Sequence, residues 1–356
     1  MPTPLSELSL MDLERTFVAW GWKPAHAGRV LRAYYAAPAD AALANDSASW
    51  NWPAGLRDRL WSEFLPSGSS VARRAEADDG TTKLLLRLAD GQLVESVLMP
   101  DFRGDRASGC LSSQVGCAMG CDFCATAKSG FARQLSAGEI VEQFLALRRE
   151  AQRAHRRLQT LVFMGMGEPL LNLDAVLAAI ERIADNRMGG LGWRQVTVST
   201  VGIVPGIDAL TATGLKLQLA VSLHAPDDAT RARLLPPGQR FSIAEILAAA
   251  DRFQARRGRP VIIQYCLLAG VNDAPAQADL LADVLAGRRM HVNLLRYNAT
   301  GPGLRGTTYA PTPEPAAEAF AARLRARGVV AHFRRSRGPE IDAACGQLRR
   351  RELTGS

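Results

Sequence analysis

From residue 110 onward, the chain alternates short apolar runs with longer stretches that carry apolar residues at helical spacing. The runs that predict strands are residues 161–164, 196–199, 217–224, 261–267, 291–295 and 329–333. Alanine-rich stretches between them, such as 243–256 and 274–286, predict helices. Repeated strand–helix units imply an α/β fold with a parallel sheet, open or rolled into a barrel. In such a fold the functional loops follow the carboxyl ends of the strands.

The first hundred residues have a different pattern. Residues 5–20 and 25–35 place apolar side chains at helical spacing, which predicts a small helical domain. Two alternating segments, 83–88 and 93–99, are joined by Ala-Asp-Gly-Gln and predict a β-hairpin. We expect four units along the chain: an N-terminal helical accessory domain (1–66), a short β linker or hairpin segment (67–102), a core (103–348) and a basic, solvated C-terminal tail (349–356).

Composition and charge narrow the function only slightly. Of 356 residues, 43 are Lys or Arg and 35 are Asp or Glu, a formal net charge of +8. This surplus fits a polyanionic partner, although a basic protein without such a partner is equally compatible with it. No apolar run approaches the length of a membrane span, and the acidic N-terminus does not resemble a signal peptide. We therefore expect a cytoplasmic protein with no membrane partner, in which six cysteines call for a chemical explanation.

Three of the cysteines form a C-x3-C-x2-C motif: Cys117, Cys121 and Cys124. Gly116 and Gly120 indicate a loop rather than a helix, and a loop can direct three thiolates at one inorganic cluster. Three thiolates on a four-iron cluster leave one iron open for another ligand. A structural zinc site would need a fourth ligand, for which only Cys110 is near in sequence. Three cysteines buried for packing alone would be a coincidence at this spacing. The motif favours a cluster.

This loop resembles that of the radical S-adenosylmethionine (SAM) superfamily, which implies one 4Fe-4S cluster whose open iron chelates SAM. Further motifs resemble the RlmN/Cfr family of radical SAM RNA adenine methyltransferases. These motifs are residues 110–117, 131–133, 164–172, 222–226, 270–273 and 341–348, and the likeness extends over about residues 80–348. The resemblance implies that residues 103–348 form a radical SAM partial (β/α) barrel. It also implies methylation of an adenine in RNA, with 23S rRNA as the expected substrate, tRNA as a second candidate, and an electron donor such as flavodoxin or ferredoxin.

The resemblance also assigns roles to particular residues. By this resemblance the SAM pocket is lined by Gly167, Glu168, Ser199, Ser222, Leu223, His224 and Asn298. The chemistry of several fits: glycine lets backbone approach a ligand, and the carboxylate of Glu168 can take the ammonium of SAM. Ser199, Ser222 and Asn298 fall at or just beyond predicted strand ends. A lone histidine such as His224 is more often structural than functional, so its assignment rests on the resemblance.

Three further residues receive catalytic roles in the same way. Cys345 resembles the family's methylated cysteine, although alone it would be interpreted as a buried structural residue. Cys110 resembles the partner cysteine that releases the RNA adduct. Glu95 matches the family's proposed proton acceptor, the alternative being an exposed strand carboxylate. Cys266 matches no functional position and is assigned to the core.

The sequence leaves alternatives open for two points: which carbon of the adenine ring receives the methyl group, and which class of function the protein has. Pro169 resembles RlmN, where Cfr carries alanine, and favours carbon 2 of adenine; residues 295–298 and 199–203 look more like Cfr and favour carbon 8. The family mechanism uses two SAM molecules per turnover, one to methylate Cys345 and one to provide the radical. A rival hypothesis is a radical SAM methylase of a peptide or small molecule. A third is a non-catalytic RNA-binding protein whose cysteines hold zinc.

Overall fold

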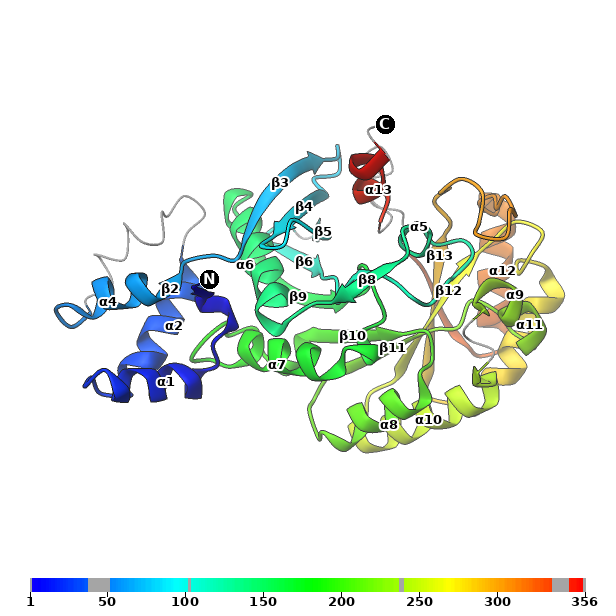
Figure 1. The fold of residues 1–356 in the computed structure, drawn as a ribbon. Helices are drawn as coiled ribbons and strands as arrows, with labels where there is room; N and C mark the ends of the chain where they lie inside the picture. The colour runs from blue at the N-terminus through cyan, green and yellow to red at the C-terminus, as the bar shows by residue number, and fades with distance from the viewer. Residues whose placement is uncertain (1, 38–51, 102–103, 237–239, 335–345, 355–356) are drawn as a thin grey trace.

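A ten-stranded sheet with the strand order β14-β13-β12-β11-β10-β9-β6-β5-β4-β3 runs through the protein (Figure 1). This computed structural model describes residues 2–37, 52–101, 104–236, 240–334 and 346–354. The strands from β14 to β6 are parallel. Their bounds are β6 Arg106–Cys110, β9 Arg157–Phe163, β10 Val196–Thr200, β11 Gln218–Ser222, β12 Val261–Leu267, β13 Met290–Arg296 and β14 Val330–Arg334. The six strands predicted after residue 110 are thus confirmed. Since β14 and β3 do not pair within the described ranges, the barrel is partial, as predicted.

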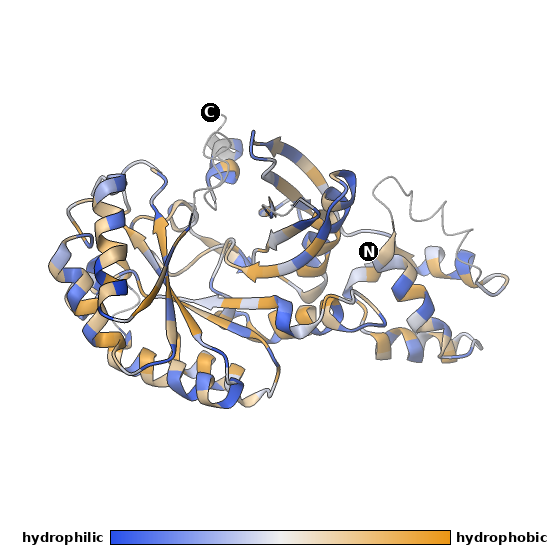
Figure 2. Ribbon diagram, turned by 180° about the vertical axis from the view of Figure 1, so that it is seen from behind, coloured by the Kyte–Doolittle hydropathy of each residue, from blue (hydrophilic) through white to orange (hydrophobic). Residues whose placement is uncertain are grey.

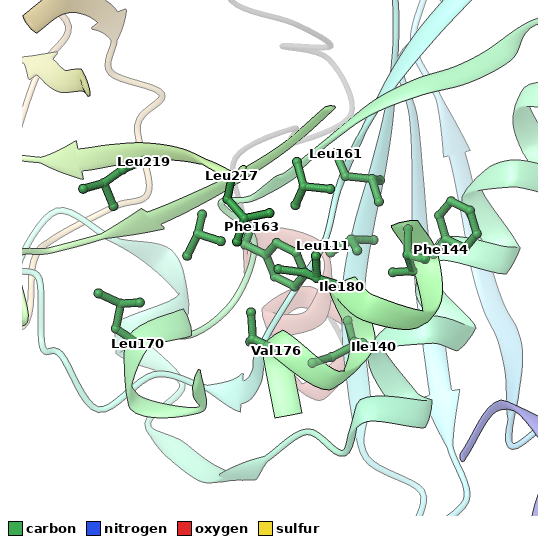
Figure 3. Packing of buried hydrophobic residues seen from close by; sticks show 14 of the residues in the cluster. Leu111, Ile140, Phe144, Leu161, Phe163, Leu170, Val176, Ile180, Leu217 and Leu219 are labelled. Carbon is green, nitrogen blue, oxygen red and sulfur yellow. The ribbon is translucent and has the colours of Figure 1, made fainter. Parts of the chain in front are cut away.

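Helices cover the outer face of this sheet (Figures 1 and 2). They are α6 Ala137–Arg153, α7 Leu173–Ala184, α8 Val204–Ala212, α9 Asp228–Leu234, α10 Ile243–Arg257, α11 Pro275–Leu285 and α12 Glu314–Ala326. Ser136 and Ser242 begin α6 and α10 with capping boxes, which satisfy backbone N–H groups of the first turn. Phe144 of α6, Ile180 of α7 and the sheet residue Phe163 belong to one buried hydrophobic cluster (Figure 3). Short 3-10 turns occur at Pro169–Leu171 and Trp193–Gln195.

The predicted hairpin is present and is part of the same sheet. Strands β4 (Thr82–Leu88) and β5 (Leu93–Pro100) pair antiparallel, and β5 continues the sheet by pairing antiparallel with β6. A further edge strand, β3 (Ser69–Glu76), pairs with β4. One face of this extension packs on α6, where Ser96 Oγ donates to Gln143 Oε1 at 3.0 Å. The opposite face carries the C-terminal helix α13, Gln347–Thr354. Residues 349–354 therefore continue a docked helix, where the sequence predicted a solvated tail.

The N-terminal part is mostly helical and is tied to the core by hydrogen bonds. It contains β1 Thr3–Pro4, the 3-10 turn Leu5–Glu7, α1 Leu10–Ala19, α2 His26–Ala36, α4 Leu56–Glu63 and β2 Phe64–Leu65. The carboxylate of Glu7 accepts from Gly138 N at 3.0 Å, at the first turn of α6. Arg182 of α7 donates to Ser6 O at 2.8 Å. The side chains of this part join the same hydrophobic cluster as the barrel. None of the helices in the described ranges is long and apolar enough to span a membrane.

Candidate active site

The three-cysteine loop lies between strand β7 (Gln114–Gly116) and the short helix α5 (Ala125–Lys128). Gly116 has φ +79°, and a Cβ there would collide with the carbonyl oxygen of Gly130, so the sequence can form this turn only with glycine. Strand β8 (Phe131–Gln134) pairs with β7 and closes the loop at its base. The buried carboxylate of Asp122 accepts from Tyr309 Oη at 2.6 Å and from Arg305 N at 2.8 Å. The loop is therefore held in place by the protein itself.

A cavity of about 430 Å³ opens at the carboxyl ends of the parallel strands. Nine of the predicted site residues line it: Cys117, Cys121, Cys124, Gly167, Glu168, Ser199, Ser222, His224 and Asn298. Ser199 belongs to β10, Ser222 ends β11 and Asn298 lies two residues beyond β13. Leu223 is fully buried and does not line the cavity. The parallel topology thus gathers predicted site residues that are up to 181 positions apart, from Cys117 to Asn298.

The three thiols are suited to a metal cluster rather than to packing. Burial raises the pKa of Cys117 to about 12 and also raises that of Cys121, so without a cation these side chains are neutral thiols. Within the described part of the chain, no three His, Cys, Asp or Glu side chains are arranged to hold a single metal ion. Three thiols facing one side of a roomy cavity fit a cluster in which each thiolate takes one iron.

Glu168 is a buried carboxylate next to the cysteine loop. Its two oxygens accept from Val201 N at 2.8 Å and from Leu170 N at 3.1 Å. Burial raises its pKa from 4.5 to about 7, and the two backbone donors oppose that rise. Gly167, with φ +99°, has no room for a side chain, because a Cβ would lie 2.5 Å from Gln114 Cβ. A carboxylate in a desolvated pocket is a strong partner for a cationic ligand group such as an ammonium.

His224 lines the cavity in a neutral form. Burial, with the nearby Arg231 guanidinium, lowers its pKa to about 3. Its Nδ1 accepts from Cys266 N at 3.0 Å, so a proton on the ring sits on Nε2. Cys266 is buried, as predicted for a core residue, and it also contributes to the cavity wall. His224 thus offers a single N–H donor rather than a positive charge.

Glu95 is buried and ion-paired, in contrast to the exposed strand carboxylate that was the alternative interpretation. It is 2% exposed, and its Oε2 lies 3.1 Å from Nζ of Lys83, which is itself fully buried. The same carboxylate accepts from Gly346 N at 2.7 Å and from Arg349 N at 2.6 Å, at the start of α13. Cys345 lies outside the described residues. Gly346 follows it directly in the chain.

Cys110 shares a face of the sheet with Glu95. In the antiparallel pairing of β5 and β6, Val97 lies opposite Cys110. Side chains alternate along a strand, so Glu95 and Val97 point to one face, and Cys110 points to that face too. Ser96, between them, points to the opposite face, toward α6. The structure therefore places Glu95 and Cys110 on the same face of the sheet, and Glu95 binds the start of α13.

The sequence reasoning missed the residues that support this arrangement. Lys83 was treated as a hairpin residue, although a lone lysine among leucines in a predicted strand was a detectable signal of a buried ion pair. Thr126 was also missed. It packs so closely on Gly346 that a Cβ on this glycine would lie 2.5 Å from Thr126 Oγ1. No local pattern could have indicated that contact.

An open β/α barrel with a three-cysteine loop and a buried carboxylate at its carboxyl edge defines the radical SAM class. In agreement, residues 111–281 match the model of the Radical SAM superfamily. A solved structure, a radical SAM methyltransferase from Sphaerobacter thermophilus, superposes with a TM-score of 0.88 at 39% identity, covering 97% of this chain and 99% of that one.

Comparison with curated proteins specifies the family. The chain is 70% identical to a probable dual-specificity RNA methyltransferase RlmN 1 of Opitutus terrae, over 98% of this chain and 97% of that protein. It is 44% identical to a probable dual-specificity RNA methyltransferase RlmN of Thermobifida fusca, over 98% and 94% respectively. The chain belongs to the RlmN family. The family prediction made from its motifs is thereby confirmed.

Proposed function

We propose that the chain methylates an adenine ring carbon in RNA, with 23S rRNA and tRNA as substrates and carbon 2 as the position. The RNA class is supported by the printed function of relatives as similar as 70% over nearly the full length. Carbon 2 is supported by Pro169, which resembles RlmN rather than Cfr, and by the RlmN names of those relatives.

The observation that supports the methylcysteine route best is the docking of Gly346. This residue contacts Thr126, two positions after the cluster cysteine Cys124, and donates its N–H to Glu95. The chain that directly follows Cys345 is thus fixed between the cysteine loop and the sheet face that carries Cys110. The methylated cysteine needs to reach the bound adenine, and the releasing cysteine needs to reach the sulfur of that methylated cysteine.

In the proposed reaction, Cys117, Cys121 and Cys124 hold a 4Fe-4S cluster, which when bound supplies the electron that cleaves SAM. Glu168 takes the ammonium of SAM, and Gly167, Ser199, Ser222, His224 and Asn298 shape the pocket around it, with Leu223 packed behind. Cys345 accepts a methyl group from one SAM by displacement, and a second SAM provides the radical that activates this methyl. An adenine ring carbon is electrophilic, so it cannot attack a sulfonium methyl directly.

Release of the product requires a base and a thiol. Once the methylene radical on Cys345 has bonded to adenine, the ring carbon loses a proton to Glu95 or Cys110, and the odd electron of the adduct would return to the cluster that supplied one electron for SAM cleavage. The Cys110 thiolate then attacks the sulfur of Cys345, the carbon–sulfur bond breaks with its electron pair on the product carbon, that carbon takes up a proton to become the methyl group, and a Cys110–Cys345 disulfide forms. Cytosolic reductants reopen it. An external one-electron donor of the flavodoxin or ferredoxin type reduces the cluster.

Mass spectrometry of nucleosides tests the proposal. The anaerobically reconstituted protein, given SAM, a reductant and RNA from a strain that lacks the gene, is expected to produce 2-methyladenosine in 23S rRNA and in tRNA. Production of 8-methyladenosine would replace the carbon 2 assignment, and a colourless protein with zinc and no iron would refute the enzyme class.

Salt dependence separates RNA from the peptide and small-molecule rivals. If phosphate contacts supply affinity, log K for RNA falls linearly with log salt, with a slope of roughly −0.7 per contact on single strands. RNA binding that is absent at low salt would favour a different substrate.

A further inference from the structure

The carboxylate of Glu95 has each of its oxygens occupied by a backbone donor from the segment that follows Cys345. Oε2 accepts from Gly346 N at 2.7 Å, and Oε1 accepts from Arg349 N at 2.6 Å. Gly346 directly precedes α13 and Arg349 lies in its first turn, where the N–H groups of a helix lack internal acceptors. A negative charge at that end is favoured by the helix dipole. Glu95 therefore acts as the N-terminal cap of α13, supplied from a strand 251 residues away in sequence.

Lys83 makes this buried cap possible. Its ammonium lies 3.1 Å from Glu95 Oε2, and both side chains are nearly inaccessible to water. A buried carboxylate without a cationic partner would be strongly disfavoured. Lys83 lies opposite Val97 on β4, so it shares the sheet face of Glu95 and Cys110. Leu348 completes the contact by packing on Leu85 and Leu93 beside the ion pair.

The docked helix reaches the other components of the site. Gly346, with φ +87°, packs against Thr126 of α5, directly after the cysteine loop. Gln347 Nε2 donates to Ala299 O at 3.0 Å, next to the cavity residue Asn298. The start of α13 thus contacts the hairpin extension, the cysteine loop helix and the loop after β13 (Figure 1). A shift of this helix start would move the residue that precedes it relative to all three.

We propose that Lys83 is a positioning residue: with Glu95 it forms an ion-paired anchor that holds the first turn of α13 and thereby sets Cys345 for methyl transfer. The inference rests on the proposed role of Cys345, but the anchor itself does not depend on RNA chemistry. It gives Glu95 a structural duty in addition to its proposed part in proton transfer.

The test uses Lys83→Met in the full-length, anaerobically reconstituted protein, with hydrogen–deuterium exchange as the first readout. We expect exchange in peptides covering 346–354 to rise at least tenfold, because the cap loses its counterion. The matched control is Arg74→Met, which deletes a strand cation paired with Glu150 of α6 at 2.8 Å, away from α13. It should leave these peptides unchanged. Parental protection in Lys83→Met would overturn the proposal.

The second readout distinguishes a specific effect on the position of Cys345 from a general disruption of the SAM cavity. Methylation of Cys345 by SAM, followed by mass spectrometry, should slow at least tenfold in Lys83→Met, while the affinity for SAM stays within about twofold. SAM affinity falling in parallel with methylation would mean that the variant perturbs the whole cavity, and the positioning role would be rejected. If exchange rises but Cys345 is never methylated even in the parent, the proposed function fails while the anchor stands.

A double variant keeps the test decisive if Lys83→Met does not fold. Lys83→Met/Glu95→Gln removes both charges of the ion pair, so it should fold more stably than the single variant, which keeps the carboxylate without its ammonium partner. Glutamine offers one carbonyl oxygen where the carboxylate offers two, so one of the two α13 donors loses its acceptor. Exchange of 346–354 should therefore remain above the parental rate. Full parental protection in the double variant would show that the charged pair does not hold α13.

Discussion

Glu168→Gln should change how the stability of the cluster-free, SAM-free protein depends on pH. Burial raises the pKa of Glu168 from 4.5 to about 7, so the protonated carboxyl favours the folded state. Its stabilising contribution is fully present below pH 4.5 and is lost as the pH rises through about 7. A glutamine cannot ionise, so the variant lacks this loss.

The size of the effect follows from the size of the pKa change. At about 1.4 kcal/mol for each pH unit between 4.5 and about 7, the wild-type protein loses roughly 3 kcal/mol that the variant keeps. For a chain of 356 residues this corresponds to about 4 °C in Tm. The hydrogen bond that glutamine forfeits, to Val201 N or Leu170 N, adds an offset that does not vary with pH.

Thermal melts of both proteins between pH 4.5 and 8.5 measure the difference directly. The Tm of Glu168→Gln minus that of the wild type should rise with pH and level off above pH 8. Glu245→Gln is a suitable control, because hydrogen bonds from Ser242 lower the pKa of that exposed carboxyl, and its difference should change only at acidic pH. Parallel curves for Glu168→Gln and wild type would refute the burial argument. SAM affinity should rise over the same pH range in the wild type and be weak and flat in the variant.

Two further outcomes follow from the cysteine assignments. Cys117→Ala should lose iron and produce no 5′-deoxyadenosine, since each thiolate holds one iron; full iron content with SAM cleavage would contradict the ligand set. Cys110→Ala should accumulate protein covalently joined to RNA on a denaturing gel, because the thiol that releases the adduct is missing, whereas Cys345→Ala should show neither protein methylation nor adduct. Normal turnover by Cys110→Ala would contradict the release step.

The strands that the sequence predicted are those formed by short runs of consecutive apolar residues that are buried in the sheet. Residues 261–267 form a mostly apolar run that is buried on both faces, and its short length directly after Pro260 indicates a buried strand. Strand β3 was missed because Ser69–Glu76 is polar and mostly exposed at the sheet edge. Strand β6, Arg106–Cys110, was missed because its small residues carry no strand signal. Its pairing with β5 and β9 is a tertiary effect.

Some residues of the candidate site could be predicted from the sequence, and others could not. Residues at strand ends could be placed from sequence, because parallel topology gathers the ends of successive strands at one edge. Ser199, Ser222 and Asn298 all line the cavity for this reason. Leu223 lies between two lining residues, Ser222 and His224, and its side chain is turned into the core. A motif marks a segment, but alternation along the backbone decides which of its side chains face the ligand.

Long-range polar contacts could not be predicted from the sequence, because they depend on which face of a strand packs against which other element. The alternation of β5 determines that Glu95 points away from α6, where its neighbour Ser96 binds Gln143. That choice leaves a carboxylate on the face where α13 docks, and a carboxylate can be buried there only with a cation and backbone donors to satisfy it. Lys83 supplies the cation, and Gly346 N and Arg349 N at the start of α13 supply the backbone donors. A buried ion pair therefore helps to fix the position of the C-terminal helix, together with the contacts of Gln347 and Leu348.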